Sequence, residues 1–168
     1  MTIMDKENQF FTAFAPTTVA THVVDSGQDV IDLSPFGGTP TANLGRNLGP
    51  GEELWLQILV QTAATSGGAA TVDFQLVTDS VAAMSSTATL ASTGAKAVAA
   101  LTAGKMFYIR LPRPDSIPAG GAGVVPYEQF LGCAIVIATA ALTAGAFQAA
   151  IVRKPQDNRS YAGGYRVA

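Results

Sequence analysis

The stretch LWLQILVQTAATSGGAATVDFQL, residues 54–76, decides the fold class of this chain. Aliphatic side chains occupy every second position from Leu54 to Val60, which is the period of a strand with one apolar face. A second alternating run extends from Val72 to Leu76, and Ser-Gly-Gly at 66–68 between the two runs is a turn signal. The stretch therefore predicts two strands joined as an antiparallel hairpin.

Strand patterns recur on both sides of this stretch. Alternation or short apolar runs predict strands at 18–24, 30–33, 105–111, 131–139 and 147–154. We expect the first two to pair around Ser26-Gly27, and the last two to form a hairpin around the turn Ala-Leu-Thr-Ala-Gly. Lys96–Leu101 suits a helical turn as well as a strand, because it is rich in alanine. No segment has the long apolar period of a helix.

An all-β chain of this size must pack two sheets face to face or close one sheet on itself. Irregular strand spacing and long connections favour Greek-key or jelly-roll wiring over a simple meander. We therefore predict a jelly-roll-like antiparallel β-sandwich of about eight strands with extended N- and C-terminal arms. The expected organisation is an N-terminal arm at 1–17, a single sandwich domain at 18–154 and a C-terminal tail at 155–168.

The composition excludes several classes of protein. With 48% apolar residues and a net charge of −2, the chain can bury a core and is not disordered. A pI near 5.2 gives no reason to expect a nucleic-acid partner. The 29 alanines and 17 threonines suit close sheet packing and a surface that is polar without being charged. The opening MTIMDKENQF lacks the apolar run of a signal peptide, which predicts synthesis in the cytoplasm.

Residues 129–152 carry no charge and are numerous enough to cross a bilayer. Thr139, Thr143 and Gly145 interrupt the apolar run, and a buried pair of strands explains the same residues. We therefore predict no membrane partner.

The residues needed for catalysis are scarce. The chain has one histidine, His22, in a strand-like run, and one cysteine, Cys133, in an apolar run. A nucleophile needs a nearby base, and zinc needs clustered cysteine and histidine side chains. Asp25, Asp29 and Asp32 are close in sequence, but their spacing matches no EF-hand loop. We therefore predict no enzyme, no metal site, no cofactor and no small-molecule substrate.

Three kinds of segment do not resemble core. Ser34–Gly51 and Pro112–Pro126 are long loops rich in glycine and proline, and long loops in a compact domain are often functional. The tail carries tyrosines and arginines, and Gln9–Ala15 carries three phenylalanines. Such aromatic ends are candidate partner contacts, and the open alternative is that they pack on their own domain.

Five short motifs, in this order, carry a family resemblance. They are MDKENQF at 4–10, NLGPGEELWL at 47–56, FQLVTD at 74–79, LTAGK at 101–105 and QDNRSYAGGY at 156–165. Together with the composition they make the chain similar to the capsid cement (decoration) proteins of short-tailed bacteriophages over nearly its whole length. Residues 34–44 form a longer insertion than the family pattern has.

The resemblance implies a jelly-roll protein without catalytic activity. It implies homodimers on the outer capsid surface of the virion, bound to the major capsid protein of the same phage. There the dimers would clamp neighbouring capsomers near local two-fold axes of an icosahedral shell.

On this basis we expect shell or dimer contacts in the N-terminal arm, in residues 43–51 of the first long loop and in the tail. The candidate residues are Phe10, Phe11, Phe14, Asn43, Arg46, Asn47, Arg159, Tyr161, Tyr165 and Arg166. A carbohydrate-binding or receptor-binding β-sandwich of a phage fibre is the alternative function, and a self-assembling shell or tube protein is a third.

Overall fold

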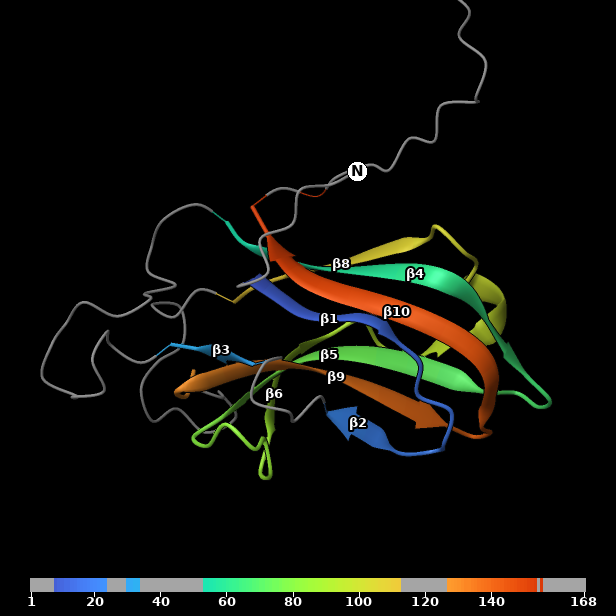
Figure 1. Cartoon of the computed structure of the whole chain (residues 1–168), viewed down its shortest axis with the longest axis horizontal. Coiled ribbons are helices and arrows are strands. Elements are labelled where there is room, and N and C mark those ends of the chain that lie inside the picture. The colour runs from blue at the N-terminus through green and yellow to red at the C-terminus, as the bar shows by residue number, and fades with distance from the viewer. Residues whose placement is uncertain (1–7, 24–29, 34–52, 113–126, 154, 156–168) are drawn as a thin grey trace, which may run out of the picture.

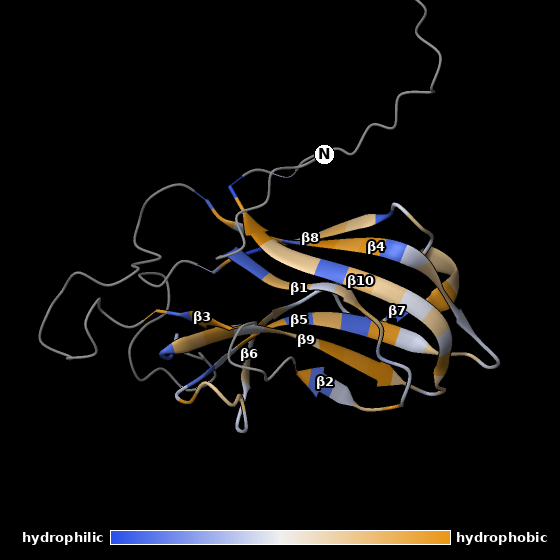
Figure 2. Ribbon diagram, in the orientation of Figure 1, coloured by the Kyte–Doolittle hydropathy of each residue, from blue (hydrophilic) through white to orange (hydrophobic). Residues whose placement is uncertain are grey.

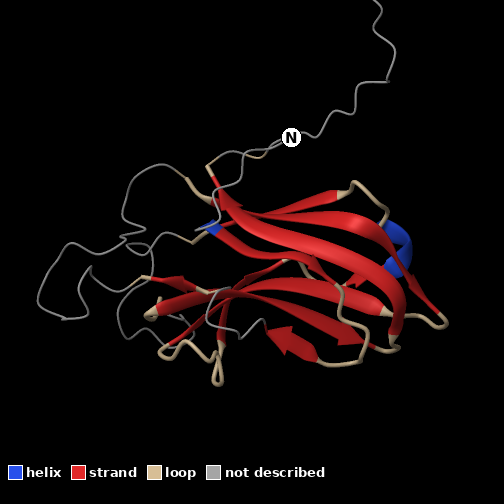
Figure 3. Ribbon diagram, in the orientation of Figure 1, coloured by secondary structure: helices blue, strands red, loops and turns tan. Residues whose placement is uncertain are grey.

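The chain forms a β-sandwich of two antiparallel sheets, as predicted (Figure 1). The structure is a computed structural model, which describes residues 8–23, 30–33, 53–112, 127–153 and 155. Strands dominate this part of the chain, and a short 3-10 helix, η2 (Val98–Ala100), lies at one end of the sandwich (Figure 3). None of the described segments is a helix of the length and apolar character that crossing a membrane requires.

Within the described residues, ten strands make up the two sheets. They are β1 (Gln9–Phe14), β2 (Thr21–Val23), β3 (Ile31–Asp32), β4 (Trp55–Ser66), β5 (Thr71–Asp79), β6 (Ala88–Ser92), β7 (Lys96–Ala97), β8 (Met106–Arg110), β9 (Phe130–Ala138) and β10 (Leu142–Val152). The four-stranded sheet has the order β1-β10-β4-β8, and the other sheet has the order β2-β9-β5-β6. In the second sheet, β3 also pairs with β9 and β7 also pairs with β5.

The strand order is that of a jelly roll. β2 and β3 pair with different parts of β9, and β6 and β7 pair with different parts of β5, so each couple occupies one strand position. The chain then visits eight positions, in which the first pairs with the eighth, the second with the seventh, the third with the sixth and the fourth with the fifth. A single antiparallel ribbon rolled into two sheets gives this pairing. The predicted jelly-roll wiring is confirmed.

The predicted hairpins are wrong, although their strands exist. β4 pairs with β10 and β8, whereas β5 lies in the opposite sheet against β9. β9 and β10 are likewise in different sheets, and β2 and β3 pair with β9 rather than with each other. The period of two reports which side chains face the core, and it is the same whether the next strand lies beside the first or opposite to it. The alternation therefore could not distinguish a hairpin from a crossing between sheets.

Three other segments differ from their predictions, and a fourth contains both of the conformations that its sequence suits. Residues 142–145 of the expected turn belong to β10, which has register shifts in this part and in which Gly145 has a φ of 144°. Lys96–Leu101 contains both expected conformations, β7 followed by η2. β6 was not predicted, because its sequence ATLAS has no large apolar side chains that alternate. Within the expected arm, Gln9–Phe14 is an edge strand paired with β10, while residues 1–7 and 156–168 lie outside the described residues.

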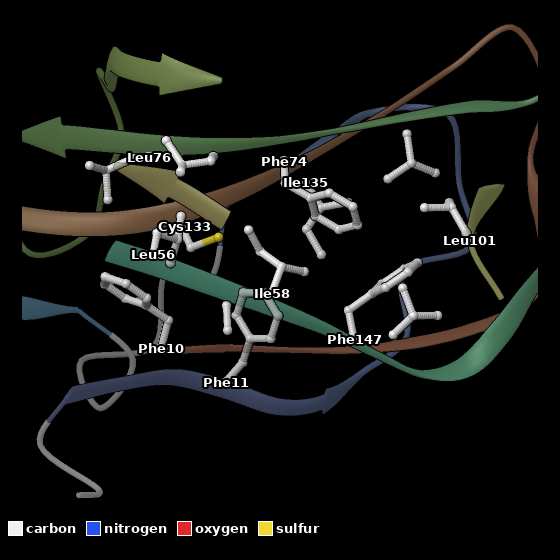
Figure 4. Close-up of a cluster of buried hydrophobic side chains, with 14 of the residues drawn as sticks. Phe10, Phe11, Leu56, Ile58, Phe74, Leu76, Leu101, Cys133, Ile135 and Phe147 are labelled. Atoms are coloured by element: carbon white, nitrogen blue, oxygen red, sulfur yellow. The ribbon is translucent and has the colours of Figure 1, made fainter. Parts of the chain in front are cut away.

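Aromatic rings join the two sheets. Phe74 of β5 packs edge-on against Phe147 of β10 with ring centroids 5.2 Å apart, and its centroid lies 5.8 Å from that of Phe107 in β8. Phe74 and Phe147 are completely buried. Figure 4 shows these two rings among aliphatic side chains from both sheets, and in Figure 2 apolar residues recur along the strands of both layers. The core therefore lies between the sheets.

The connection from β5 to β6 covers part of the outer side of the six-stranded sheet. Asp79 ends β5, and its carboxylate accepts hydrogen bonds from the backbone N–H groups of Ser86 (2.7 Å) and Val81 (3.1 Å). These donors, that of Ser86 above all, hold the pKa of Asp79 below its usual value. The connection that these hydrogen bonds hold in place positions Met84, which is 4% exposed, in a small apolar cluster with Val77 and Ala134.

Candidate interaction surfaces

Cys133 and His22, the residues first considered for catalysis, make packing and hydrogen-bond contacts within the sandwich. Cys133 is fully buried between the sheets, and burial raises the pKa of its thiol. The Nε2 atom of His22 lies 2.8 Å from the carbonyl oxygen of Thr18, and its ring stands edge-on to Phe14. Across the described segments, no three His, Cys, Asp or Glu side chains are grouped so that they could hold a metal ion. Asp25 and Asp29 lie outside these segments.

The N-terminal phenylalanines belong to the sandwich. Phe10 is completely buried and Phe11 is 5% exposed, and both contribute to the core (Figure 4). Phe14 is half-buried, with its ring centroid 5.3 Å from that of Phe11. Of the two alternatives that the sequence left open, packing on the chain's own domain describes Phe10 and Phe11. A partner contact by any of the three stays a prediction.

The other candidate contacts lie outside the described residues, but the structure shows where their segments are attached. They are Asn43, Arg46, Asn47, Arg159, Tyr161, Tyr165 and Arg166. The loop that contains the first three connects β3 to β4, and the tail follows β10. The end of β10 and the start of β4 are side by side, because Val152 pairs with Trp55. Trp55 also pairs with Arg110 at the end of β8.

These attachment points form one end of the sandwich, which we call the loop end (Figure 1). β1 begins there, since Gln9 pairs with Ala150 near the end of β10. β3 ends there and β9 begins there, since Asp32 pairs with Phe130. The N-terminal segment, the two long loops and the tail therefore all leave the sandwich at the loop end, although they are far apart in the sequence.

Hydrogen bonds hold the loop end together. The hydroxyl of Tyr127 donates to the carbonyl oxygen of Pro112 over 2.7 Å, which closes the base of the loop between them. Burial raises the pKa of Tyr127 to about 12, so this hydroxyl keeps its proton at neutral pH. The backbone N–H of Leu111 donates to the carbonyl oxygen of Leu54 over 2.9 Å, and Arg110 forms an ion pair with Glu53. The segments thus start from fixed positions.

A second surface is the outward side of the four-stranded sheet, which we call the outer face. Residues that pair directly across strands point to the same side of a sheet, so the register defines its members. They are Gln9 of β1, Trp55, Gln57 and Leu59 of β4, Met106, Tyr108 and Arg110 of β8, and Gln148, Ala150 and Val152 of β10. Arg110, at one border of the face, is exposed and charged, whereas the other members are uncharged and are buried or half-buried. Aromatic, methionine and uncharged residues are typical of the centre of a protein interface.

The centre of the outer face contains a buried polar group. Gln57 lies in one row with Gln9, Ala150 and Tyr108. Gln57 is 5% exposed and Ala150 is 2% exposed, although both are on the outward side of the sheet. The Oε1 atom of Gln57 is buried and has no hydrogen-bond partner in the described part of the chain. The alternation from Leu54 to Val60 places Gln57 on the outward side of its strand, but its burial could not be predicted from that pattern.

Comparisons with known proteins agree with the extent of the sandwich. The sequence model of the Bbp16 family matches residues 12–151, from within β1 to the penultimate residue of β10. No curated protein sequence matches the chain.

Proposed function

The chain belongs to the Bbp16 family, a family of phage proteins, and on that premise we propose that it is a capsid cement (decoration) protein. In this function it binds the outside of an icosahedral phage shell and joins neighbouring capsomers of the major capsid protein. It acts by binding alone, as a homodimer in the virion. The proposal specifies the phage function that family membership leaves open.

The observation that carries the proposal is the convergence of attachment points at the loop end. The described strand ends to which two long loops, the N-terminal segment and the tail are attached all lie at one end of the sandwich (Figure 1). Arg159 and Tyr161 in the tail and Arg46 in the first loop are residue types that often anchor protein interfaces. Segments that start together can contact one partner surface together, and this arrangement suits attachment to a shell.

The physical effect of such binding is mechanical. Packaged DNA presses outward on the shell and tends to separate the capsomers. A protein bound to two capsomers adds contact free energy that opposes their separation. A dimer doubles the attachment points, so the second contact forms at a high effective concentration and the whole binds more tightly than one contact would.

The first test uses capsids of the same phage that lack this protein. We expect the purified chain to co-sediment with them in a fixed ratio and to raise the temperature at which the shells open. A folded protein that leaves the shells unchanged and binds glycans in a screen would refute the proposal and favour the fibre-module alternative.

The second test removes part of the loop end. Deletion of the last ten residues, 159–168, is expected to weaken shell binding while the sandwich stays folded, because no described strand includes them. Arg46→Ala is a finer variant with the same expected direction. Lys105→Ala is the matched control, since Lys105 is an exposed cation that precedes β8 at the end of that strand remote from the loop end. Equal shell occupancy for all three variants would contradict the assignment of the loop end.

A further inference from the structure

We propose that the turn at residues 81–84 is a preformed apolar contact between this chain and the capsid shell. The inference rests on the proposed function and adds to it a contact site made of described residues. The turn belongs to the β5–β6 connection, residues 80–87, which starts at the loop end (Figure 1). Asp79, the last residue of β5, pairs there with Phe130, and Phe130 also pairs with Asp32 at the end of β3. The connection therefore begins beside the point where the first long loop leaves the sandwich.

The turn exposes a large apolar side chain. In the described part of the chain, the large hydrophobic residues that are exposed are Val81, at 45%, and Val19, at 55%. Val19 lies at the opposite end of the sandwich, because Thr17, two residues before it, accepts a hydrogen bond from Leu142 at the start of β10. A single exposed valine is common on protein surfaces. Val81 differs from such a residue because the backbone that carries it is held in one conformation.

The carboxylate of Asp79 holds the connection on both sides of the turn. It is 1% exposed, and it accepts hydrogen bonds from the backbone N–H groups of Val81 over 3.1 Å and of Ser86 over 2.7 Å. The backbone N–H of Met84 donates to the carbonyl oxygen of Val81 over 3.0 Å, which closes the turn itself. Burial of a carboxylate is costly unless hydrogen bonds satisfy it. Here the donors belong to the connection, so the buried charge favours one conformation of that segment.

Met84 anchors the turn to the six-stranded sheet. Its φ of 49° lies in the left-handed region, which residues other than glycine seldom adopt. Its side chain is 4% exposed and packs with Val77 and Ala134, and a Cβ on Gly132 would lie 2.6 Å from its terminal methyl group. Such backbone conformations persist where the surrounding structure imposes them, and they cluster at functional sites. The sandwich thus keeps Met84 directed inward and Val81 directed outward.

The chemistry of the connection indicates the kind of partner that it fits. Its sequence, SVAAMSST, contains no charged residue, and Ala83 in the turn is exposed as Val81 is. A segment that is already held in one conformation loses little conformational entropy on binding. We therefore expect the turn to fit a shallow apolar recess on the shell. Because the connection begins at the loop end, it is within reach of the same partner surface as the loops and termini that start there.

The test compares Val81→Asp with Val19→Asp, its matched control at the opposite end of the sandwich. Co-sedimentation of each full-length variant with capsids that lack the protein gives the dissociation constant. Val81→Asp should raise it about tenfold or more, because the carboxylate loses its water against an apolar recess, whereas Val19→Asp should leave it unchanged. Both variants should unfold at the Tm of the parent chain, since both side chains are exposed. Equal dissociation constants for the two variants would overturn the proposal.

Met84→Ala tests whether the anchor acts through the turn. It should weaken shell binding although Val81 is still present, because the turn loses its fixed conformation. The double variant Val81→Asp/Met84→Ala should bind about as well as Val81→Asp alone, since the contact that Met84 supports is already lost. Fully additive effects would contradict the role of Met84. A parent chain that does not bind shells would refute both the proposed function and this contact, whereas a parent chain and a Val81→Asp variant that bind equally well would refute the contact alone.

Discussion

Replacing Phe74 by alanine should weaken the packing between the two sheets and lower the free energy of unfolding. The Phe74 ring on β5 contacts the rings of both Phe147 and Phe107 in the opposite sheet. Phe74 is completely buried, and truncation of a buried phenylalanine costs about 3–5 kcal/mol. Each aromatic pair adds about 0.5–1.5 kcal/mol beyond the area that it buries, so we expect a value in the upper part of this range. For a chain of this length, that corresponds to a fall in Tm of very roughly 8–20 °C.

Urea unfolding of the parent and the variant, followed by tryptophan fluorescence, measures the difference directly. Phe107→Ala is the control, because Phe107 is only half-buried and its loss should cost clearly less. A double-mutant cycle of Phe74→Leu with Phe147→Leu should give a coupling of about 1 kcal/mol. A cost below about 1 kcal/mol for Phe74→Ala would show that this ring does not hold the sheets together, and the account of the core would be wrong.

Three further predictions concern single residues. Gly132→Ala should destabilise the fold by about 1 kcal/mol, because the new Cβ would lie 2.6 Å from the flexible end of Met84, and the cost should largely vanish in a Met84→Ala background. The pKa of Asp79 is lowered in the folded state, so the carboxylate stabilises the fold above about pH 4, and this stabilisation is lost as the pH falls through the folded-state pKa. Asp79→Asn should therefore lower the Tm at pH 7 and make the Tm depend less on pH in the acid range. Thermal unfolding at several pH values measures both effects. Cys133 should react with a thiol reagent only after denaturation, since burial raises the pKa of its thiol, and rapid labelling of the native chain would contradict its burial.

The candidate contact sites were only partly accessible to sequence reasoning. The aromatic and arginine content of the tail and of the first long loop can be read directly, and so can the phenylalanines near the N-terminus. The burial of Phe10 and Phe11 was not readable, because an edge strand and a free arm can share the same aromatic sequence until pairing with β10 is known. The convergence at the loop end was also invisible, since it depends on pairs such as Trp55 with Val152, which are far apart in the chain.

The outer face illustrates the same limit. The alternation from Leu54 to Val60 predicts that Gln57 points away from the core, and this is correct. Its burial, at 5% exposure, depends on the surroundings of the strand in the folded chain, which the alternation does not contain. A single strand contains no information about which strands will flank it.

The sequence alone determined the all-β class, the approximate positions of most strands and the face that each long strand turns to the core. These are local properties, because successive side chains of an extended backbone point to opposite sides wherever the strand is placed. Only the tertiary structure decided that β4 and β5 lie in different sheets, that β1 is a strand and that the loops and termini leave from one end. Those features depend on hydrogen bonds between distant segments and on two sheets packing over one core. Such long-range contacts cannot be predicted from the sequence of any one segment.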